Sequence, residues 1–139
     1  MLFRSRGEYR IALETVQDGL AFIKVNCPSE KNGVLKWALG VFYFDMKDYE
    51  RSILNYSETL SQCAESEYMN FNSYAYTCIG MGCAWKGKGD YKQAINYLLT
   101  GLNSSRENNL WMEESRALYE IGLLEKERGE FGQIGRAHV

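Results

Sequence analysis

One pattern of about forty residues recurs along the chain and constrains the fold more than any other feature of the sequence. Its clearest copy reads GKGDYKQAINYLLTGL, residues 87–102. The aromatic residue of this copy recurs at intervals of 40, 42 and 40 residues, at Tyr9, Tyr49, Tyr91 and Phe131. An acidic residue directly precedes each of these aromatics. Repeats of this length indicate a fold built from similar units that stack on one another.

The residues that follow each aromatic have the spacing of one face of an α-helix. Apolar side chains lie four, seven and eleven positions after Tyr9, Tyr49 and Tyr91, which is the spacing of a buried helical stripe. A small residue lies three positions after each of these aromatics and another lies ten positions after it, namely Ala12, Ser52 and Ala94, then Gly19, Thr59 and Gly101. We therefore expect another helix to approach closely on this face.

A second set of residues precedes the aromatics and predicts a helix followed by a turn. Gly40, Gly82 and Gly122 lie nine positions before an aromatic. A glycine inside a helix costs roughly 1 kcal/mol relative to alanine, so three in one register indicate backbone contact between helices. The Gly-Asp or Gly-Glu pair before the aromatic can end one helix in the left-handed conformation and cap the next. Lys47 replaces the glycine in one copy, so we expect that turn to be strained or differently closed.

These features together resemble the tetratricopeptide repeat (TPR). LGVFYFDMKDYERSILNYSETL and MGCAWKGKGDYKQAINYLLTGL follow its order of Leu-Gly, aromatic, Gly-Asp-Tyr and small residues, and RGEYRIALETVQDGL and IGLLEKERGEF follow it in part. The period exceeds the family's usual ~34 residues and resembles the longer repeats of bacterial regulators and peptide sensors. The resemblance implies an all-α fold, an α-solenoid of stacked antiparallel helix pairs (a TPR-like superhelix).

We expect one TPR-like repeat segment over residues 6–133. It divides into a partial repeat (6–27), two full repeats (30–67 and 70–107) and a second partial repeat (110–133). The periodicity predicts helices over about 8–25, 31–46, 49–65, 70–87, 91–107 and 110–128. Residues 1–5 and 134–139 have no repeat register, and they resemble read-through of a sequencing adapter, so we expect them to be non-native ends.

Composition argues against several classes of function. The formal net charge is -2, whereas nucleic-acid-binding domains usually carry a basic excess. No apolar run reaches the ~18 residues of a membrane helix, and no apolar signal region follows Met1. We therefore expect a cytoplasmic chain that binds neither nucleic acid nor membrane directly.

The sequence contains no pattern typical of catalysis, a metal site or a cofactor site, so we expect the chain not to be an enzyme. Its only histidine is His138. The four cysteines include no CxxC pair and are interpreted as reduced thiols packed as small hydrophobic residues; they are Cys27, Cys63, Cys78 and Cys83. The acidic residues Glu113, Glu114 and Glu120 are interpreted as a solvated helix face.

In the TPR family the first helix of each pair lines a concave groove that holds a peptide or a partner helix. The resemblance assigns this role to Val34, Trp37, Val41, Phe44, Asp45, Tyr76, Ile79, Cys83, Lys86, Arg116, Tyr119, Leu123, Lys126 and Glu127. Because the set is mostly apolar, it favours an amphipathic helix or apolar segment over a clamped carboxylate. The alternative is that these aromatics belong to the core, and we expect Trp85 and Tyr43 there.

The leading interpretation is therefore a scaffold module that binds a protein or peptide, a fragment of a larger multi-repeat protein. The alternative is the peptide- or partner-sensing region of a bacterial transcription regulator or signalling protein, in which binding shifts a linked domain.

Overall fold

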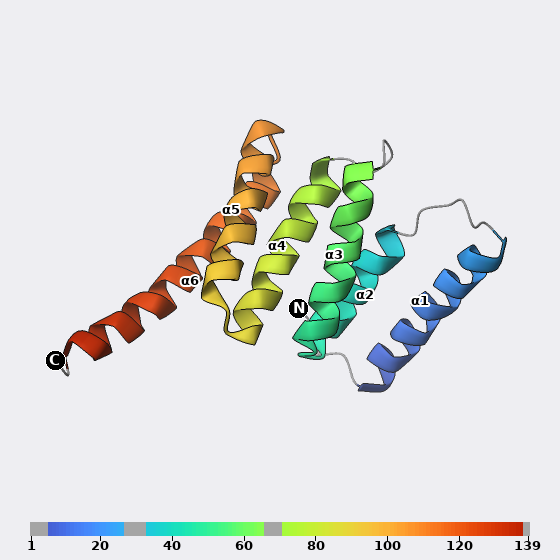
Figure 1. Cartoon of the computed structure of the whole chain (residues 1–139), viewed down its shortest axis with the longest axis horizontal. Coiled ribbons are helices and arrows are strands. Elements are labelled where there is room, and N and C mark those ends of the chain that lie inside the picture. Colours follow the sequence, from blue (N-terminus) through green and yellow to red (C-terminus); the bar gives the residue numbers. More distant parts are fainter. Residues whose placement is uncertain (1–5, 27–32, 66–70, 138–139) are drawn as a thin grey trace.

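The computed structural model describes residues 6–26, 33–65 and 71–137, and these residues form helices joined by short turns. In chain order the helices are α1 (Arg6–Asn26), α2 (Gly33–Asp45), α3 (Tyr49–Glu65), α4 (Phe71–Lys88), α5 (Tyr91–Glu107) and α6 (Trp111–Ala137). No strand occurs in the described ranges, so the all-α expectation is confirmed there. Successive helices run in alternating directions (Figure 1), as short connections require. No helix in these ranges is long and apolar enough to cross a membrane.

The helix bounds agree closely with the periodicity, except at the last helix. The ranges predicted for α3 and α5 match the structure at both ends, and α4 is displaced by one residue. The turn predicted at Gly129 and Glu130 is absent, because α6 continues as a helix to residue 137. No described helix follows α6 to pack back against it, and continuing the helix satisfies the backbone hydrogen bonds that a turn would leave open. The sequence-based end of the last repeat at residue 133 therefore lies inside a helix.

The turns after α2 and α4 have the same geometry. In the first, the amides of Lys47 and Asp48 donate to the carbonyls of Phe44 and Tyr43, at 2.9 Å each. The second repeats both bonds 42 residues later, at 3.0 Å, and Gly89 there has φ 89°. This is the Schellman ending of a helix, which favours glycine. Lys47 adopts the same conformation, with φ 62°, so the predicted strain at this position is confirmed.

Glycines allow the two helices of each pair to touch. A Cβ atom on Gly40 of α2 would lie 2.6 Å from ring atoms of Tyr56 on α3, and one on Gly82 of α4 would lie 2.6 Å from Leu98 Cγ on α5. Both contacts join residues 16 positions apart and therefore repeat with the period of the sequence. The prediction of close approach is wrong for Gly122, where a Cβ atom would meet nothing within 4 Å. The reason is that no described helix covers this face of α6.

A second contact recurs one turn further along each pair. The hydroxyl of Thr59 on α3 donates to the carbonyl oxygen of Gly33 on α2, at 3.4 Å. At the equivalent place in the next pair, a Cβ atom on Gly101 would lie 3.3 Å from the carbonyl oxygen of Ala75. The α2–α3 and α4–α5 pairs therefore share both their register and the way they pack.

Helix pairs contact one another through aromatic rings and the glycines that face them. A Cβ atom on Gly80 of α4 would lie 2.9 Å from Tyr56 Cζ, and one on Gly87 would overlap the ring of Tyr49. The helix α4 also touches both α2 and α6. The main core forms around α4 and α5, and its most buried members are Ile79, Ala94, Leu98, Ala117 and Leu124.

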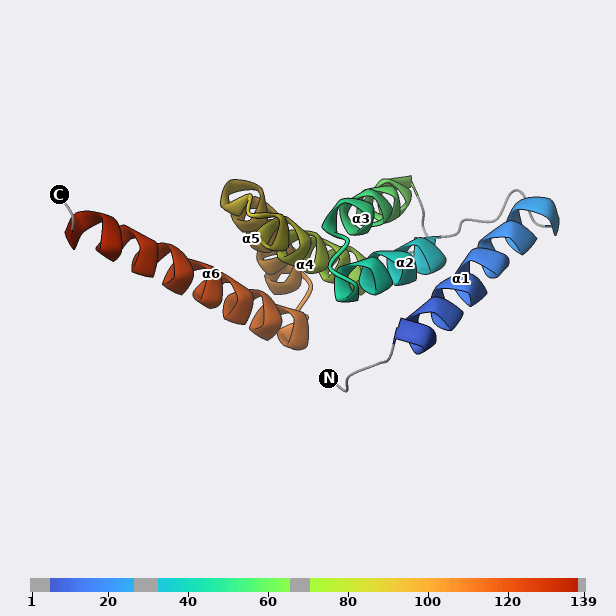
Figure 2. The same cartoon turned by 90° about the horizontal axis from the view of Figure 1, so that it is seen from below.

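The first helix is the least embedded element. No residue of α1 is buried, and among the described helices α1 packs only on α2. A Cβ atom on Gly19 would lie 3.5 Å from Leu35 Cδ1 of α2, an ordinary van der Waals distance. Figure 2 shows α1 and α6 at the two ends of the row of helices.

Candidate binding groove

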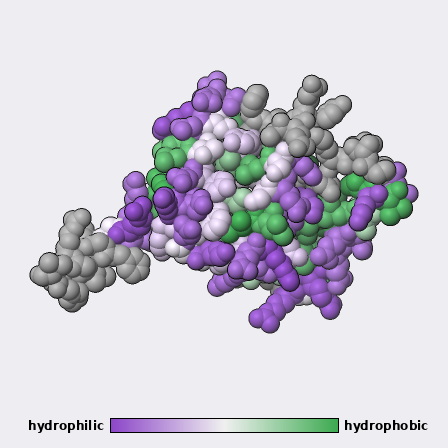
Figure 3. Space-filling view, viewed as in Figure 1, coloured by the Kyte–Doolittle hydropathy of each residue, from purple (hydrophilic) through white to green (hydrophobic). Residues whose placement is uncertain are grey.

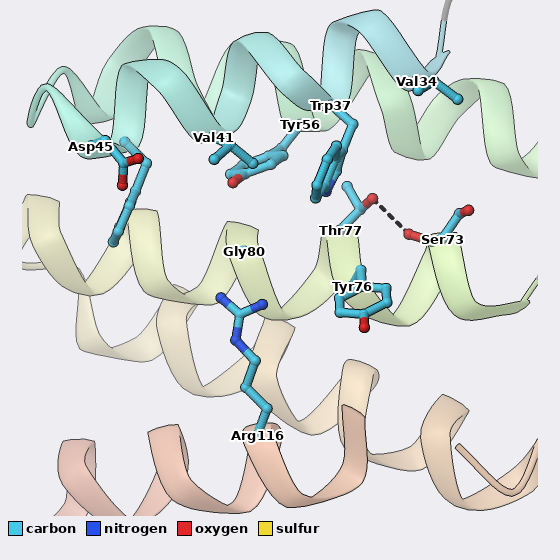
Figure 4. A pocket seen from close by; sticks show the side chains of 11 residues that line it. Val34, Trp37, Val41, Asp45, Tyr56, Ser73, Tyr76, Thr77, Gly80 and Arg116 are labelled. Carbon is cyan, nitrogen blue, oxygen red and sulfur yellow. Dashed lines mark hydrogen bonds between the residues drawn. The ribbon is translucent and has the colours of Figure 1, made fainter. Parts of the chain in front are cut away.

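A groove of about 690 Å³ opens between α2 and α4. Figure 4 shows side chains from α2 along one wall, side chains from α4 along the other, and Arg116 reaching in from α6. The lining residues, which we call the α2–α4 groove, are Val34, Trp37, Val41, Phe44, Asp45, Tyr56, Ser73, Tyr76, Thr77, Gly80 and Arg116. The TPR resemblance had assigned all five α2 residues, Tyr76 and Arg116 to such a surface. The structure therefore brings together half of the predicted set.

The α2 wall supplies large apolar side chains that remain accessible to solvent. Val34 is 69% exposed and Trp37 is 36% exposed. They lie about one helical turn apart on α2, followed by Val41 and Phe44 at the same spacing. Phe44 also packs against the core and contacts Tyr49 edge to face, with ring centroids 5.7 Å apart. Thus Trp37 is a groove residue, whereas Phe44 belongs to both the groove and the core.

The floor of the groove is fixed by a ring held between two glycines. Tyr56 is 4% exposed, and it lies between Gly40 of α2 and Gly80 of α4. Burial raises the pKa of the Tyr56 phenol far above its usual range, and the field of Asp45 adds to the increase while that of Arg116 opposes it. The phenol of Tyr56 therefore stays neutral. The charged side chains among the residues that line the groove are Arg116 and Asp45.

A buried carboxylate links the groove to α6. The hydroxyl of Tyr76 forms a hydrogen bond with Glu113, and this bond, more than burial, raises the pKa of Tyr76. Glu113 is only 5% exposed. The interpretation of Glu113 as part of a solvated face is therefore wrong, because α6 turns this side chain inward against α4. Glu114, by contrast, reaches solvent and accepts from Arg106 Nε at 3.0 Å.

A second, smaller hollow lies between α4 and α6 and contains three more predicted residues, Cys83, Lys86 and Glu127. It is lined by Phe44, Tyr49, Cys83, Lys86, Gly87, Arg116, Glu120 and Glu127. Lys86 Nζ lies 3.3 Å from Glu127 Oε1, so this ion pair bridges α4 and α6. Burial, followed by the charge of Glu120, raises the pKa of the Cys83 thiol to about 12. Arg116 borders both hollows and therefore joins them.

The remaining predicted residues do not line the α2–α4 groove. Ile79 is fully buried, because Gly101 lets α5 lie against it; a Cβ atom there would be 2.9 Å from Ile79 Cγ1. Tyr119 is 65% exposed, and its helical position places it beside Gly122, on a face that no described helix covers. Leu123 and Lys126 line neither hollow. Residues at equivalent positions of the repeat can therefore line the groove, belong to the core or lie on the exposed surface, depending on which helix covers them.

The repeat pattern also missed groove residues. Tyr56 belongs to the second helix of its pair and was predicted only as part of a buried stripe, yet it forms the floor. Thr77 was also missed; its hydroxyl donates to the backbone carbonyl of Ser73 at 2.7 Å. Gly80 is the sequence feature that could have predicted the role of Tyr56. A glycine within a helix leaves room for an aromatic ring of a neighbouring helix to pack against the backbone, as Tyr56 does here.

The described residues offer no basis for a metal centre or a reactive thiol. No cluster of three or more His, Cys, Asp or Glu residues suited to a metal ion occurs among them. Cys78 and Cys83 are buried, with burial raising the pKa of Cys78 to about 11, and Cys63 is half-buried. Cys27 and His138 lie outside the described residues. Trp85 and Tyr43, predicted as core, are half-buried, and Trp85 packs against the core.

The chain was compared with known protein families, with characterised proteins and with solved structures, and none of the three comparisons finds a match. The resemblance to the tetratricopeptide repeat therefore stays a prediction from the repeated residues of the sequence.

Proposed function

We propose that the chain is a TPR-like α-solenoid segment whose α2–α4 groove binds an apolar or amphipathic segment of a protein. The observation that carries this proposal is the accessible aromatic wall of α2, with Trp37 at its centre, facing α4 across a groove of about 690 Å³. Monomeric surfaces rarely keep such apolar concavities unless they bind something. The proposal includes no catalytic activity and places the protein in the cytoplasm.

The repeated packing supports the solenoid part of the proposal. The two complete pairs share their turns, their glycine contacts and their 42-residue offset. The contacts of α4 with both α2 and α6 are those expected if the first helices of successive pairs line one surface. Stacking of equivalent pairs with a constant offset generates a superhelix with an extended binding face.

The charges around the groove restrict the ligand. Arg116 is an exposed cation at the α6 side, and Asp45 is a half-buried anion at the end of α2. A bound helix that presents apolar residues at i, i+3 or i+4 and i+7 to Trp37, Val41 and Tyr76 would satisfy the apolar wall. An acidic residue near Arg116 would add a charge-assisted contact. We therefore propose an amphipathic helix with an acidic flank as the ligand.

Selection from a phage-displayed peptide library on the immobilised chain tests this function. Selected peptides should share apolar residues at helical spacing together with an acidic residue. Their affinity, measured by fluorescence polarisation, should fall about tenfold or more on Trp37→Ala, because aromatic anchors dominate such interfaces. Arg116→Gln should weaken binding less, and this loss should shrink as salt is added.

Leu99→Ala is the matched control. Leu99 is an exposed apolar residue, at 43%, and it lies on α5 outside the groove. Peptides that lose affinity equally with Leu99→Ala and Trp37→Ala would be binding to exposed apolar surface in general. That result, or a selection that enriches no peptide, would contradict the proposed function.

A further inference from the structure

The outward face of α6 is apolar and uncovered. Trp111 is 73% exposed, Met112 58%, Leu118 45% and Tyr119 65%. Helical spacing places these side chains on one face, the α6 end face, defined as Trp111, Met112, Ser115, Leu118, Tyr119 and Gly122. The opposite side of α6 carries Glu113, Ala117 and Leu124, which are buried against the rest of the protein. Thus α6 has two apolar faces, of which one is occupied.

The equivalent face of α4 is covered, and it shows what the α6 end face is built to hold. Forty residues upstream, Ser115, Leu118, Tyr119 and Gly122 correspond to Ala75, Cys78, Ile79 and Gly82. The exposed fractions of Ala75, Cys78 and Ile79 do not exceed 1%, and Gly82 is also buried, because α5 lies directly on them. The α6 end face is therefore shaped for a helix of the α5 type.

The covering helix must carry a bulky residue with small residues on either side. On α5 these are Leu98, which packs on Gly82, with Ala94 four positions before it and Gly101 three positions after it. On α3 the same places hold Tyr56, Ser52 and Thr59, which are at most 4% exposed. Without small residues at the outer positions the two backbones could not approach so closely.

The helix α1 carries this pattern and has an open side. Its residues at the three places are Ala12, Val16 and Gly19. Each of them is half-buried beside α2, where a Cβ atom on Gly19 would lie 3.5 Å from Leu35 Cδ1, and no residue of α1 is fully buried. Whereas α3 is packed between α2 and α4, α1 contacts α2 alone. Among the described helices, α1 and α6 therefore lie at the two ends of the row, and each has one face that no described helix covers (Figure 2).

We propose that α1 of a second copy of this chain docks on the α6 end face. In this arrangement Val16 of one copy packs on Gly122 of the other, as Leu98 packs on Gly82. Gly19 then faces Ser115, Leu118 and Tyr119, as Gly101 faces Ala75, Cys78 and Ile79. The contact joins two different surfaces and leaves one of each free on every dimer, so it adds copies head to tail and produces a series of oligomers. The α2–α4 groove is not involved.

Sedimentation equilibrium of the full chain from low to high micromolar concentration tests the proposal. The average mass should rise continuously above the 16.0 kDa of the monomer and should not level off at a dimer. Leu118→Glu combined with Tyr119→Glu should abolish the increase without loss of helical circular dichroism, because both side chains are exposed. Leu54→Glu combined with Leu99→Glu is the matched control, since both are exposed apolar residues on other helices, and this variant should still associate.

Gly122→Leu separates specific docking from general adhesion of apolar surface. A leucine adds apolar area, so it should strengthen non-specific association. In the proposed contact its side chain would occupy the place of Val16, so association should weaken about tenfold or more. A wild-type chain that stays monomeric at high micromolar concentration would overturn the proposal, leaving this face to a helix from another chain. Stronger association on Gly122→Leu, or an equal loss in the Leu54/Leu99 control, would also overturn it.

A mixing experiment identifies the partner surface. Ala12→Glu combined with Val16→Glu should block α1 while leaving the α6 end face intact. This variant and the Leu118/Tyr119 variant should each be monomeric alone and should form a one-to-one complex when mixed. If the α1 variant loses helical circular dichroism, Ala12→Glu alone replaces it in the mixture. Two variants that fold but form no mixed complex would overturn the assignment of α1 as the occupant. Trp37→Ala should leave association unchanged, so loss of groove binding and loss of docking can be told apart.

Discussion

Glycines in one register should respond to alanine with opposite signs. Gly82 and Gly122 both lie nine positions before an aromatic, and both lie within a helix. A Cβ atom on Gly82 would lie 2.6 Å from Leu98 Cγ, 2.8 Å from Leu98 Cδ2 and 3.1 Å from the carbonyl oxygen of Ala94. A Cβ atom on Gly122 would meet nothing within 4 Å among the described residues. The two substitutions therefore differ only in what covers the helix.

The expected magnitudes follow from two opposing terms. Replacing an interior helical glycine by alanine gains about 1 kcal/mol of helix propensity. Overpacking a core costs about 1–3 kcal/mol, and Gly82 belongs in the upper half of that range because one obstructing atom is backbone. We therefore expect Gly82→Ala to lower the free energy of unfolding by about 1–2 kcal/mol, and Gly122→Ala to raise it by about 1 kcal/mol.

Urea denaturation followed by far-ultraviolet circular dichroism measures both changes. The protein should be kept at low micromolar concentration so that association does not add to stability. Gly40→Ala is a useful third variant, since its Cβ atom would lie 2.6 Å from the ring of Tyr56, and it should be destabilising like Gly82→Ala. Equal midpoints for Gly82→Ala and the wild type, or a lower midpoint for Gly122→Ala, would refute the account of helix contact through glycine.

Three further predictions concern other parts of the molecule. Trp85→Ala should cost about 3 kcal/mol of stability as a truncation at the core, while Trp37→Ala should affect partner binding far more than folding; equal losses of stability would remove Trp37 from the groove. Lys47→Gly should stabilise the protein by about 1 kcal/mol, because a side chain is strained at φ 62°, and an unchanged urea midpoint would contradict this. Burial raises the pKa values of Cys78 and Cys83 from 9.0 to about 11 and about 12, so the unfolded chain loses these protons first. The free energy of unfolding should therefore not depend on these thiols below pH 9. Above pH 9 it should fall by about 1.4 kcal/mol per pH unit for each thiol. A free energy that stays constant up to pH 11 would contradict the burial of the two thiols.

The groove shows that the repeat pattern predicts where a residue lies on its helix but does not predict whether its side chain is buried. Equivalent places in three successive units hold Trp37, Ile79 and Tyr119. Trp37 is 36% exposed, Ile79 is fully buried and Tyr119 is 65% exposed. The sequence predicts that the three places are equivalent on their helices. It does not show which neighbouring helix covers each one, and this decides the burial. Glu113 is a second example. Its acidic side chain was predicted to be exposed to solvent, but it is buried and forms a hydrogen bond with Tyr76.

What the sequence alone determined is local and periodic. The bounds of α3 and α5, the turns at Lys47 and Gly89 and the glycines at the α2–α3 and α4–α5 contacts follow from residue type and spacing, because helix formation, capping and turns depend on neighbours within a few positions. The tertiary structure alone decided which faces are covered. It placed Tyr56 on the floor of the groove, left α1 and the outward face of α6 open, and extended α6 through Gly129, because each outcome depends on whether a helix distant in sequence packs there.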